Sequence, residues 1–214
     1  MEQWLQNLPV ADRAKIAAIL LEIEEVGFDA LGCDFRQVQS KLWELKIRSA
    51  SGGFRIFYVA IIGPEMVLLH AIRKGKQKIP KKDLELALKR KEWRISSMSK
   101  TRHKAFSGFL KKQQTDPEFR ILFDVQCVKL HIARLVKTAR TQRGWTQAEL
   151  AQRVGTTQSV IARLESASDE REPSLHLLGR LASALGFQLA LSFERMKKTP
   201  PRRCVVNCDN LTTY

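Results

Sequence analysis

The stretch LWELKIRSASGGFRIFYVAIIGPEMVLLHAI, residues 42–72, decides the fold of the first half of the chain. It holds three apolar runs rich in β-branched and aromatic residues, and two glycine-containing segments, SGG and GPE, separate them. Runs of this length between turn-forming residues are typical of antiparallel hairpins. The sequence therefore predicts three strands, at Leu42–Arg48, Phe54–Ile62 and Met66–Ile72.

The segments on either side of this block have helical patterns. In Ala11–Val26 the apolar residues recur every three or four positions, and Gly27 follows as a stop. Pro80 opens a second helix, Lys81–Arg94, because proline is favoured in the first helical turn. We expect Asp34–Ser40, before the first strand, to be a short helical or irregular stretch.

The second half of the chain is helical wherever its pattern is strong. Thr146 with Glu149 three residues later forms a capping-box pattern, and Gly155 and Gly186 are helix stops. Phe187–Phe193 alternates apolar and polar residues, which favours a terminal strand. The expected helices are Phe106–Gln113, one or two within Pro117–Arg143, Thr146–Val154, Gln158–Glu165 and Ser174–Leu185.

These elements define an α+β fold, in which a small antiparallel sheet with packed helices precedes an all-α domain. We place the first domain at residues 1–95 and the second at residues 105–196. The polar residues 96–104 carry no periodic signal and are the expected junction, and Met98 within them could begin a separate reading frame. We expect the tail, residues 197–214, to be disordered.

Composition narrows the function classes. A hydrophobic content of 44% argues against a disordered chain, and no apolar run approaches the ~20 residues that span a bilayer, so we expect a cytoplasmic protein. The four cysteines do not have the spacing of a zinc site, and we expect no metal or cofactor.

The charge balance points to a polyanionic partner. The chain has a net charge of +15, with 17 Lys and Arg against 12 Asp and Glu in residues 1–97, and 20 against 10 in residues 98–214. Both halves are basic, so each can meet nucleic acid independently.

The predicted strands place cations at positions that can share a sheet face: Lys46, Arg55, Arg73 and Lys74, with Arg48 nearby. Adjacent antiparallel strands bring such side chains within a few ångströms of one another. A cluster of this kind can hold a phosphodiester and stabilise a pentavalent transition state without a metal. We expect Arg55 to be a solvent-facing cation and His70 to be a packed, hydrogen-bonded histidine.

TQAELAQRVGTTQSVIARLE, residues 146–165, has the spacing of a helix-turn-helix. The second helix of such a unit presents its N-terminal side chains to base edges in the major groove, and glutamine can pair bidentately with adenine. We expect Gln147, at the start of the first helix, to contact a backbone phosphate. The expected groove residues are Thr157, Gln158, Ser159 and Arg163.

The first half resembles the HigB-like branch of the RelE/ParE superfamily over about Phe28–Trp93. The ordered motifs are an E-L-cation strand, a Gly-rich hairpin, an R-x-x-Y strand, an L-H-x-hydrophobic-cation-cation strand and a K-x-P before a closing helix. The resemblance implies an endoribonuclease that cleaves mRNA on the translating ribosome through 2′-hydroxyl attack. The residues it implies are catalytic are Lys46, Arg55, Tyr58, Arg73 and Lys74.

Within that resemblance Arg55 would hold the scissile phosphate, and Arg73 or Lys74 would neutralise the transition state or protonate the leaving oxygen. The family's usual arginine after E-L is Lys46 here, and neither His nor Tyr follows the closing helix as a terminal base. The general base is therefore left open.

The second half resembles Cro-like repressors, and among them HigA-type antitoxins, over about Asp116–Phe193. The resemblance implies a homodimer that binds operator DNA, represses transcription and neutralises the toxin through a contact within or between chains. Two alternatives remain open at this point. The first half could be a ParE-like inhibitor of DNA gyrase, or it could be inactive beside a functional repressor.

Overall fold

The structure is a computed structural model that describes residues 2–60, 66–75, 79–96, 106–168 and 171–191. It divides into two compact units, Met1–Phe123 and Asp124–Tyr214. The division falls within the long helix α5 (Pro117–Gln142). Most of the expected junction at residues 96–104, and the whole of the tail at residues 197–214, lie outside the described residues.

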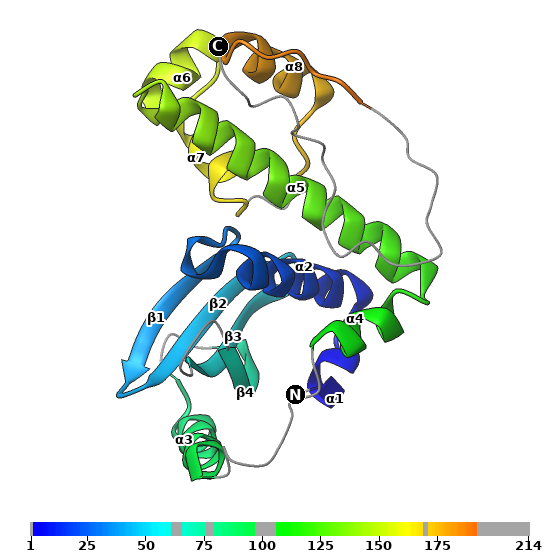
Figure 1. The fold of residues 1–214 in the computed structure, drawn as a ribbon, viewed down its shortest axis with the longest axis vertical. Helices are drawn as coiled ribbons and strands as arrows, with labels where there is room; N and C mark the ends of the chain where they lie inside the picture. Colours follow the sequence, from blue (N-terminus) through cyan, green and yellow to red (C-terminus); the bar gives the residue numbers. More distant parts are fainter. Residues whose placement is uncertain (1, 61–65, 76–78, 97–105, 169–170, 192–214) are drawn as a thin grey trace. The chain divides into compact units, whose positions relative to one another are not determined.

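The first unit is built on an antiparallel sheet with strand order β1-β2-β3-β4 (Figure 1). The three predicted strands are confirmed as β2 (Leu42–Ser49), β3 (Gly52–Ala60) and β4 (Met66–Lys74). The α+β fold class is therefore correct.

The prediction of a helical or irregular stretch at Asp34–Ser40 was wrong. This segment forms β1 (Cys33–Gln39), which pairs with β2 along the edge of the sheet. Most of its side chains are exposed, because an edge strand has a neighbour on only one side. Because the segment is polar, its sequence does not show the apolar pattern from which the other strands were predicted.

Helices cover both faces of the sheet (Figure 1). On one face lie α1 (Glu2–Gln6) and α2 (Val10–Val26), where Trp4 meets the Phe54 ring edge-on at 5.8 Å between centroids. The turn η1 (Gly27–Asp29) follows α2. We call this side of the sheet the α2 face.

The opposite side, the α3 face, packs against α3 (Lys81–Ser96). Ala87 of α3 is fully buried there, with Leu84 and Leu88 beside it. The buried sheet residues of this cluster are Leu42, Phe57, Val59, Val67 and Leu69. The first unit continues through α4 (Phe106–Gln113) into the first residues of α5.

The second unit is helical, as predicted. After α5 come α6 (Gln147–Val154), α7 (Gln158–Glu165) and α8 (Leu175–Ala184). They enclose a core that includes Leu150, Ile161, Leu181 and Leu185.

The predicted boundaries of α6 are confirmed in detail. The Thr146 side chain accepts a hydrogen bond from the Glu149 backbone, and the Glu149 carboxylate accepts one from the Thr146 backbone N–H, which completes the capping box. Gly155 ends the helix at φ +66, a left-handed conformation that glycine adopts without strain.

The predicted terminal strand is not found in the described residues 187–191, which form no regular element. Residues 192 and 193 lie outside the described part of the chain. No helix among the described residues is long and apolar enough to span a bilayer.

Candidate functional site

Three of the expected cations, Lys46, Arg55 and Lys74, share the α3 face. Lys46 lies opposite Arg55 in the β2–β3 register, and Lys74 lies opposite Gly53, two residues before Arg55. Alternate residues of a strand point to the same face, as do directly paired residues. Phe57 and Val59, toward the end of β3, belong to the apolar cluster under α3. The cations therefore lie near the start of β3.

A carboxylate that the sequence analysis did not single out lies among these cations. The Glu44 side chain is 0% exposed, and its Oε1 lies 3.2 Å from Arg55 Nε. Its Oε2 lies 3.9 Å from Lys46 Nζ. A buried carboxylate is stable only beside compensating charge, so Glu44 fixes the position of Arg55.

Arg55 is consequently not the solvent-facing cation that we expected. Its side chain is only 5% exposed and forms part of a buried ion pair. The period-two pattern of β2 places Glu44 and Lys46 on one face, but only the cross-strand register brings Arg55 to that face.

A pocket of about 480 Å³ opens beside this cluster. Arg55 reaches it from β3, and Lys74 reaches it from β4. The Lys74 stem lies across Gly53, where an added Cβ would come within 3.1 Å of it. The residues that line the pocket are Arg55, Ile72, Arg73, Lys74, Gly75, Ile79 and Pro80.

The side chain of Arg73 leaves β4 on the other side. Its guanidinium lies 5.7 Å from the centre of the Phe54 ring, 3.6 Å from Asp12 Oδ2 and 3.2 Å from Ser51 Oγ. These partners all belong to the α2 face. The structure therefore separates the Arg73 guanidinium from the other cations, although Arg73 is among the residues that line the pocket.

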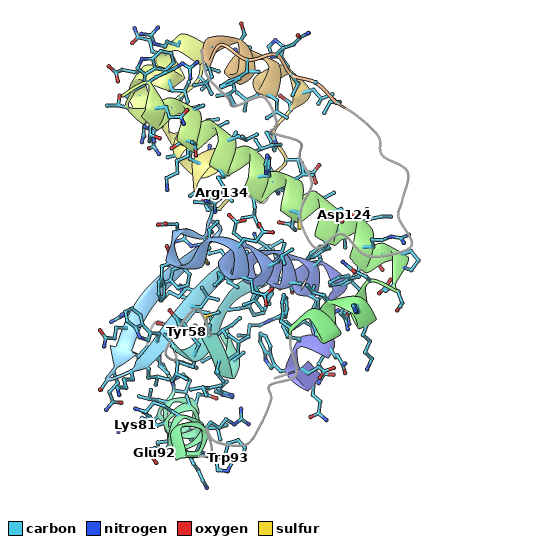
Figure 2. The ribbon with its side chains drawn as sticks, in the orientation of Figure 1. Tyr58, Lys81, Glu92, Trp93, Asp124 and Arg134 are labelled. Atoms are coloured by element: carbon cyan, nitrogen blue, oxygen red, sulfur yellow. The ribbon has the colours of Figure 1, made fainter. Side chains whose placement is uncertain are left out.

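Tyr58 also lies away from the cation cluster. It is fully buried on the α2 face, where its ring lies 6.3 Å from Phe35 and 6.4 Å from Trp43 between centroids. Figure 2 labels Tyr58 in the sheet. Burial, and secondarily Cys33, raises the pKa of its hydroxyl to about 12. Its hydroxyl finds no hydrogen-bond partner among the residues that the structure describes. In this position Tyr58 does not face a phosphate held by Arg55.

His70 is a packed histidine, as expected. Its Nε2 lies 2.8 Å from Asp83 Oδ1, and its ring stacks on Phe57. Its Nδ1 lies 3.4 Å from Arg90 Nη1, and Arg90 also donates a hydrogen bond to the Leu69 carbonyl. Both ring nitrogens are therefore engaged in joining α3 to β4.

In the second unit, Gln147 and Gln158 are joined to each other. Gln158 Nε2 donates a hydrogen bond to Gln147 Oε1 at 3.0 Å, and Gln147 Nε2 donates one to Glu165 Oε2 at 2.9 Å. Glu165 is buried, and Arg140 donates to both of its oxygens, at 2.6 Å and 2.9 Å. The hydrogen bond to Glu165 raises the pKa of Arg140 above its ordinary value.

The other expected groove residues lie on the exposed start of α7. Thr157 is its N-cap, and the Thr157 and Ser159 hydroxyls are 3.1 Å apart. Arg163, one turn later, is exposed and donates to the Ser159 carbonyl at 3.2 Å. Thr157, Gln158, Ser159 and Arg163 thus share one exposed region of α7.

No group of three or more His, Cys, Asp or Glu residues within the described ranges could hold a metal ion. Cys33 is the first residue of β1, and burial together with the nearby Asp34 and Glu22 raises the pKa of its thiol to about 12. Cys127 is buried in α5.

Together these features define two classes of domain in one chain: a small antiparallel-sheet domain with an open pocket bordered by cations, and a helix-turn-helix DNA-binding domain. Comparison with protein families agrees with this division. Residues 3–92 match the family described as phage derived protein Gp49-like, and residues 136–191 match the family described as helix-turn-helix. No solved structure matches the chain significantly.

Proposed function

We propose that the chain joins an endoribonuclease toxin, in residues 1–95, to the antitoxin that restrains it, in residues 105–196. The observation that carries the proposal is the pair Arg55 and Lys74 at one pocket, with both Arg55 and its cross-strand neighbour Lys46 beside the buried Glu44. The match to a phage-derived family over residues 3–92 and the resemblance to HigB-like toxins support it.

The proposed reaction uses no metal. The 2′-oxygen of the RNA forms a bond to the adjacent phosphorus while the P–O5′ bond breaks, which leaves a 2′,3′-cyclic phosphate and a free 5′-hydroxyl. Arg55 and Lys46 bind the non-bridging oxygens, whose negative charge increases in the transition state. The 2′-proton passes to solvent.

Lys74 is the proposed donor of a proton to the leaving 5′-oxygen. It is exposed at the pocket, whereas Arg73 is engaged with Asp12 on the other face. We therefore propose Lys74, and not Arg73, as the proton donor. The resemblance to HigB-like toxins supports mRNA on the translating ribosome as the substrate.

The second domain is the proposed operator-binding repressor. Its exposed α7 would lie in the major groove, with Gln158 contacting base edges and Gln147 contacting a phosphate. A homodimer of this domain would contact two half-sites about 34 Å apart. The match of residues 136–191 to the helix-turn-helix family supports both the proposed DNA contacts and the proposed homodimer on DNA.

The experiment that tests the toxin proposal compares two activities after the antitoxin half has been removed by proteolysis. Primer extension in a translating extract measures mRNA cleavage, and a supercoiling assay measures gyrase inhibition. We expect discrete cuts in mRNA and unchanged supercoiling. The reverse result would favour the ParE-like alternative, which needs no cluster that holds a phosphate, and inactivity in both would favour a repressor with an inactive first half.

A further inference from the structure

Helix α2 is buried on all sides over nearly two turns. Seven consecutive residues, from Ala14 to Leu20, are buried, Lys15 among them. At 3.6 residues per turn, a run of this length points in every direction around the helix axis. A helix that is apolar and buried all round requires packing partners on more than one side.

The sheet accounts for only one of these sides. The Asp12 carboxylate accepts hydrogen bonds from Ser49 and Ser51 at the β2–β3 turn, which fixes the sheet-facing side of α2. The next residue, Arg13, has its Nη2 3.8 Å from Oδ2 of Asp116, in the turn between α4 and α5. The residues just beyond the junction thus reach α2 within the first unit.

The segment from residue 106 to residue 123, which belongs to the first unit, carries a buried apolar face. In the first turns of α5, Phe119 is 0% exposed and Phe123 is 2% exposed, and their rings stack. Ile121, between them, is 63% exposed. Burial at positions i and i+4 with exposure at i+2 shows that one side of this helix is packed. In α4, Phe109 and Leu110 are buried as well.

We infer that residues 106–123 are the toxin-binding segment of the antitoxin and that its docking surface is the side of α2 turned away from the sheet. The inference rests on the proposed function and adds the location of the neutralising contact. The docking surface lies behind the α2 face, and the cations of the pocket lie on the α3 face. On this inference the antitoxin inhibits the toxin without placing acidic side chains over Lys46, Arg55 and Lys74.

The first turn of α2 links the two sides. Asp12 pairs with Arg73 at the end of β4, and Arg13 pairs with Asp116 of the docked segment. Loss of the segment would expose the apolar side of α2 and release Arg13. The contact is apolar in its centre and carries a charge pair at its edge, as stable interfaces commonly do.

The test uses the full chain with a protease site inserted between residues 97 and 105. After cleavage, a dilution series on a sizing column measures the dissociation constant of the two pieces. We expect the wild-type pieces to remain together. Phe119→Ala should weaken the association by about 100-fold or more, as large truncations of buried aromatics do. Ile121→Ala, two residues away on the exposed side, should match the wild type.

A charge exchange provides a second readout that leaves the apolar core intact. Asp116→Arg places two cations together and should weaken the association several-fold, and adding Arg13→Asp should restore it. Separation of the wild-type pieces on cleavage would overturn the inference, and so would equal effects of Phe119→Ala and Ile121→Ala. None of these measurements depends on ribonuclease activity, so failure of the docking site and failure of the toxin assignment are distinguishable.

Discussion

The Nε atom of Arg55 lies 3.2 Å from Oε1 of Glu44, and the two side chains are only 5% and 0% exposed. Arg55 is therefore held on the sheet before any substrate arrives. Its charge compensates an anion that would otherwise be buried alone. The same residue consequently affects both the stability of the first unit and any chemistry at the pocket.

Arg55→Ala should destabilise the first unit by about 3–5 kcal/mol, because it leaves a buried carboxylate without its closest partner. The measurement is the free energy of unfolding of the full chain in denaturant, with a probe in the sheet. Arg48→Ala removes an exposed cation from the same strand face and should change stability by less than about 0.5 kcal/mol. A value for Arg55→Ala as small as that of Arg48→Ala would contradict the buried pair. Loss of activity in Arg55→Ala alone is therefore no evidence of catalysis.

Lys74 and Arg73 are neighbours in the sequence, but only Lys74 is proposed to take part in catalysis, so their alanine variants should differ in activity. Lys74→Ala should reduce mRNA cleavage by about 100-fold or more, as expected when the general acid that protonates the leaving oxygen is lost. Arg73→Ala should reduce it by less than about 10-fold, because its side chain contacts the other face. Primer extension with each variant, after removal of the antitoxin half, measures the difference. A larger loss with Arg73→Ala would show that the pocket is wrongly assigned.

The sequence predicts the sheet better than it predicts the site. Alternation and turn residues identify three strands because those strands are largely buried. The edge strand β1 was not predicted, because its exposed positions hold polar residues and do not show the apolar pattern of a buried strand. Adjacent residues of one strand point to opposite faces, which is why the side chains of Arg73 and Lys74 lie on different sides of the sheet. The partner of Arg55 depends on the cross-strand register, which becomes certain only once the sheet is formed.

Gln158→Ala should reduce the preference for the operator over nonspecific DNA by about 10- to 100-fold, the range of one bidentate base contact. Gln147→Ala should weaken binding to all DNA, and should also lower specificity in part, because Gln147 Oε1 accepts the hydrogen bond that orients Gln158. Gln152, exposed on α6, provides a matched control. A gel-shift series with specific and random duplexes measures both effects. An unchanged ratio for Gln158→Ala would show that α7 is not the recognition helix.

The DNA-binding site shows the same limit of sequence analysis. The spacing of residues 146–165 identifies the helix-turn-helix and the exposed Gln158 at the start of its second helix. The chain of hydrogen bonds from Arg140 through Glu165 to Gln147 was not predicted. It joins residues 25 positions apart, and nothing in the local pattern links them. Glu165 looks like an ordinary helix-terminal carboxylate until the fold buries it.

The capping box of α6 should make the second unit sensitive to acid. Hydrogen bonds from Thr146 lower the pKa of Glu149 below its ordinary value of 4.5. A lowered pKa in the folded state means that the stabilisation is fully present above pH 4.5 and is lost as the pH falls through the folded-state value. The wild type should therefore exceed Glu149→Ala in unfolding midpoint near neutral pH, and the difference should shrink below pH 4.5. Fluorescence of Trp145, with the other tryptophans replaced by phenylalanine, reports on this unit. A difference that is constant with pH would contradict the assignment.

We propose that one half of this chain is a ribonuclease that the other half restrains. The most direct measurement is primer extension on mRNA in a translating extract that contains the full chain with a cleavable site between residues 97 and 105. The account predicts no discrete cuts with the uncut chain, and none after cleavage while the two pieces stay together. Discrete cuts should appear once the C-terminal piece is degraded. Full cutting by the uncut chain, or no cutting after complete removal of that piece, would contradict the claim.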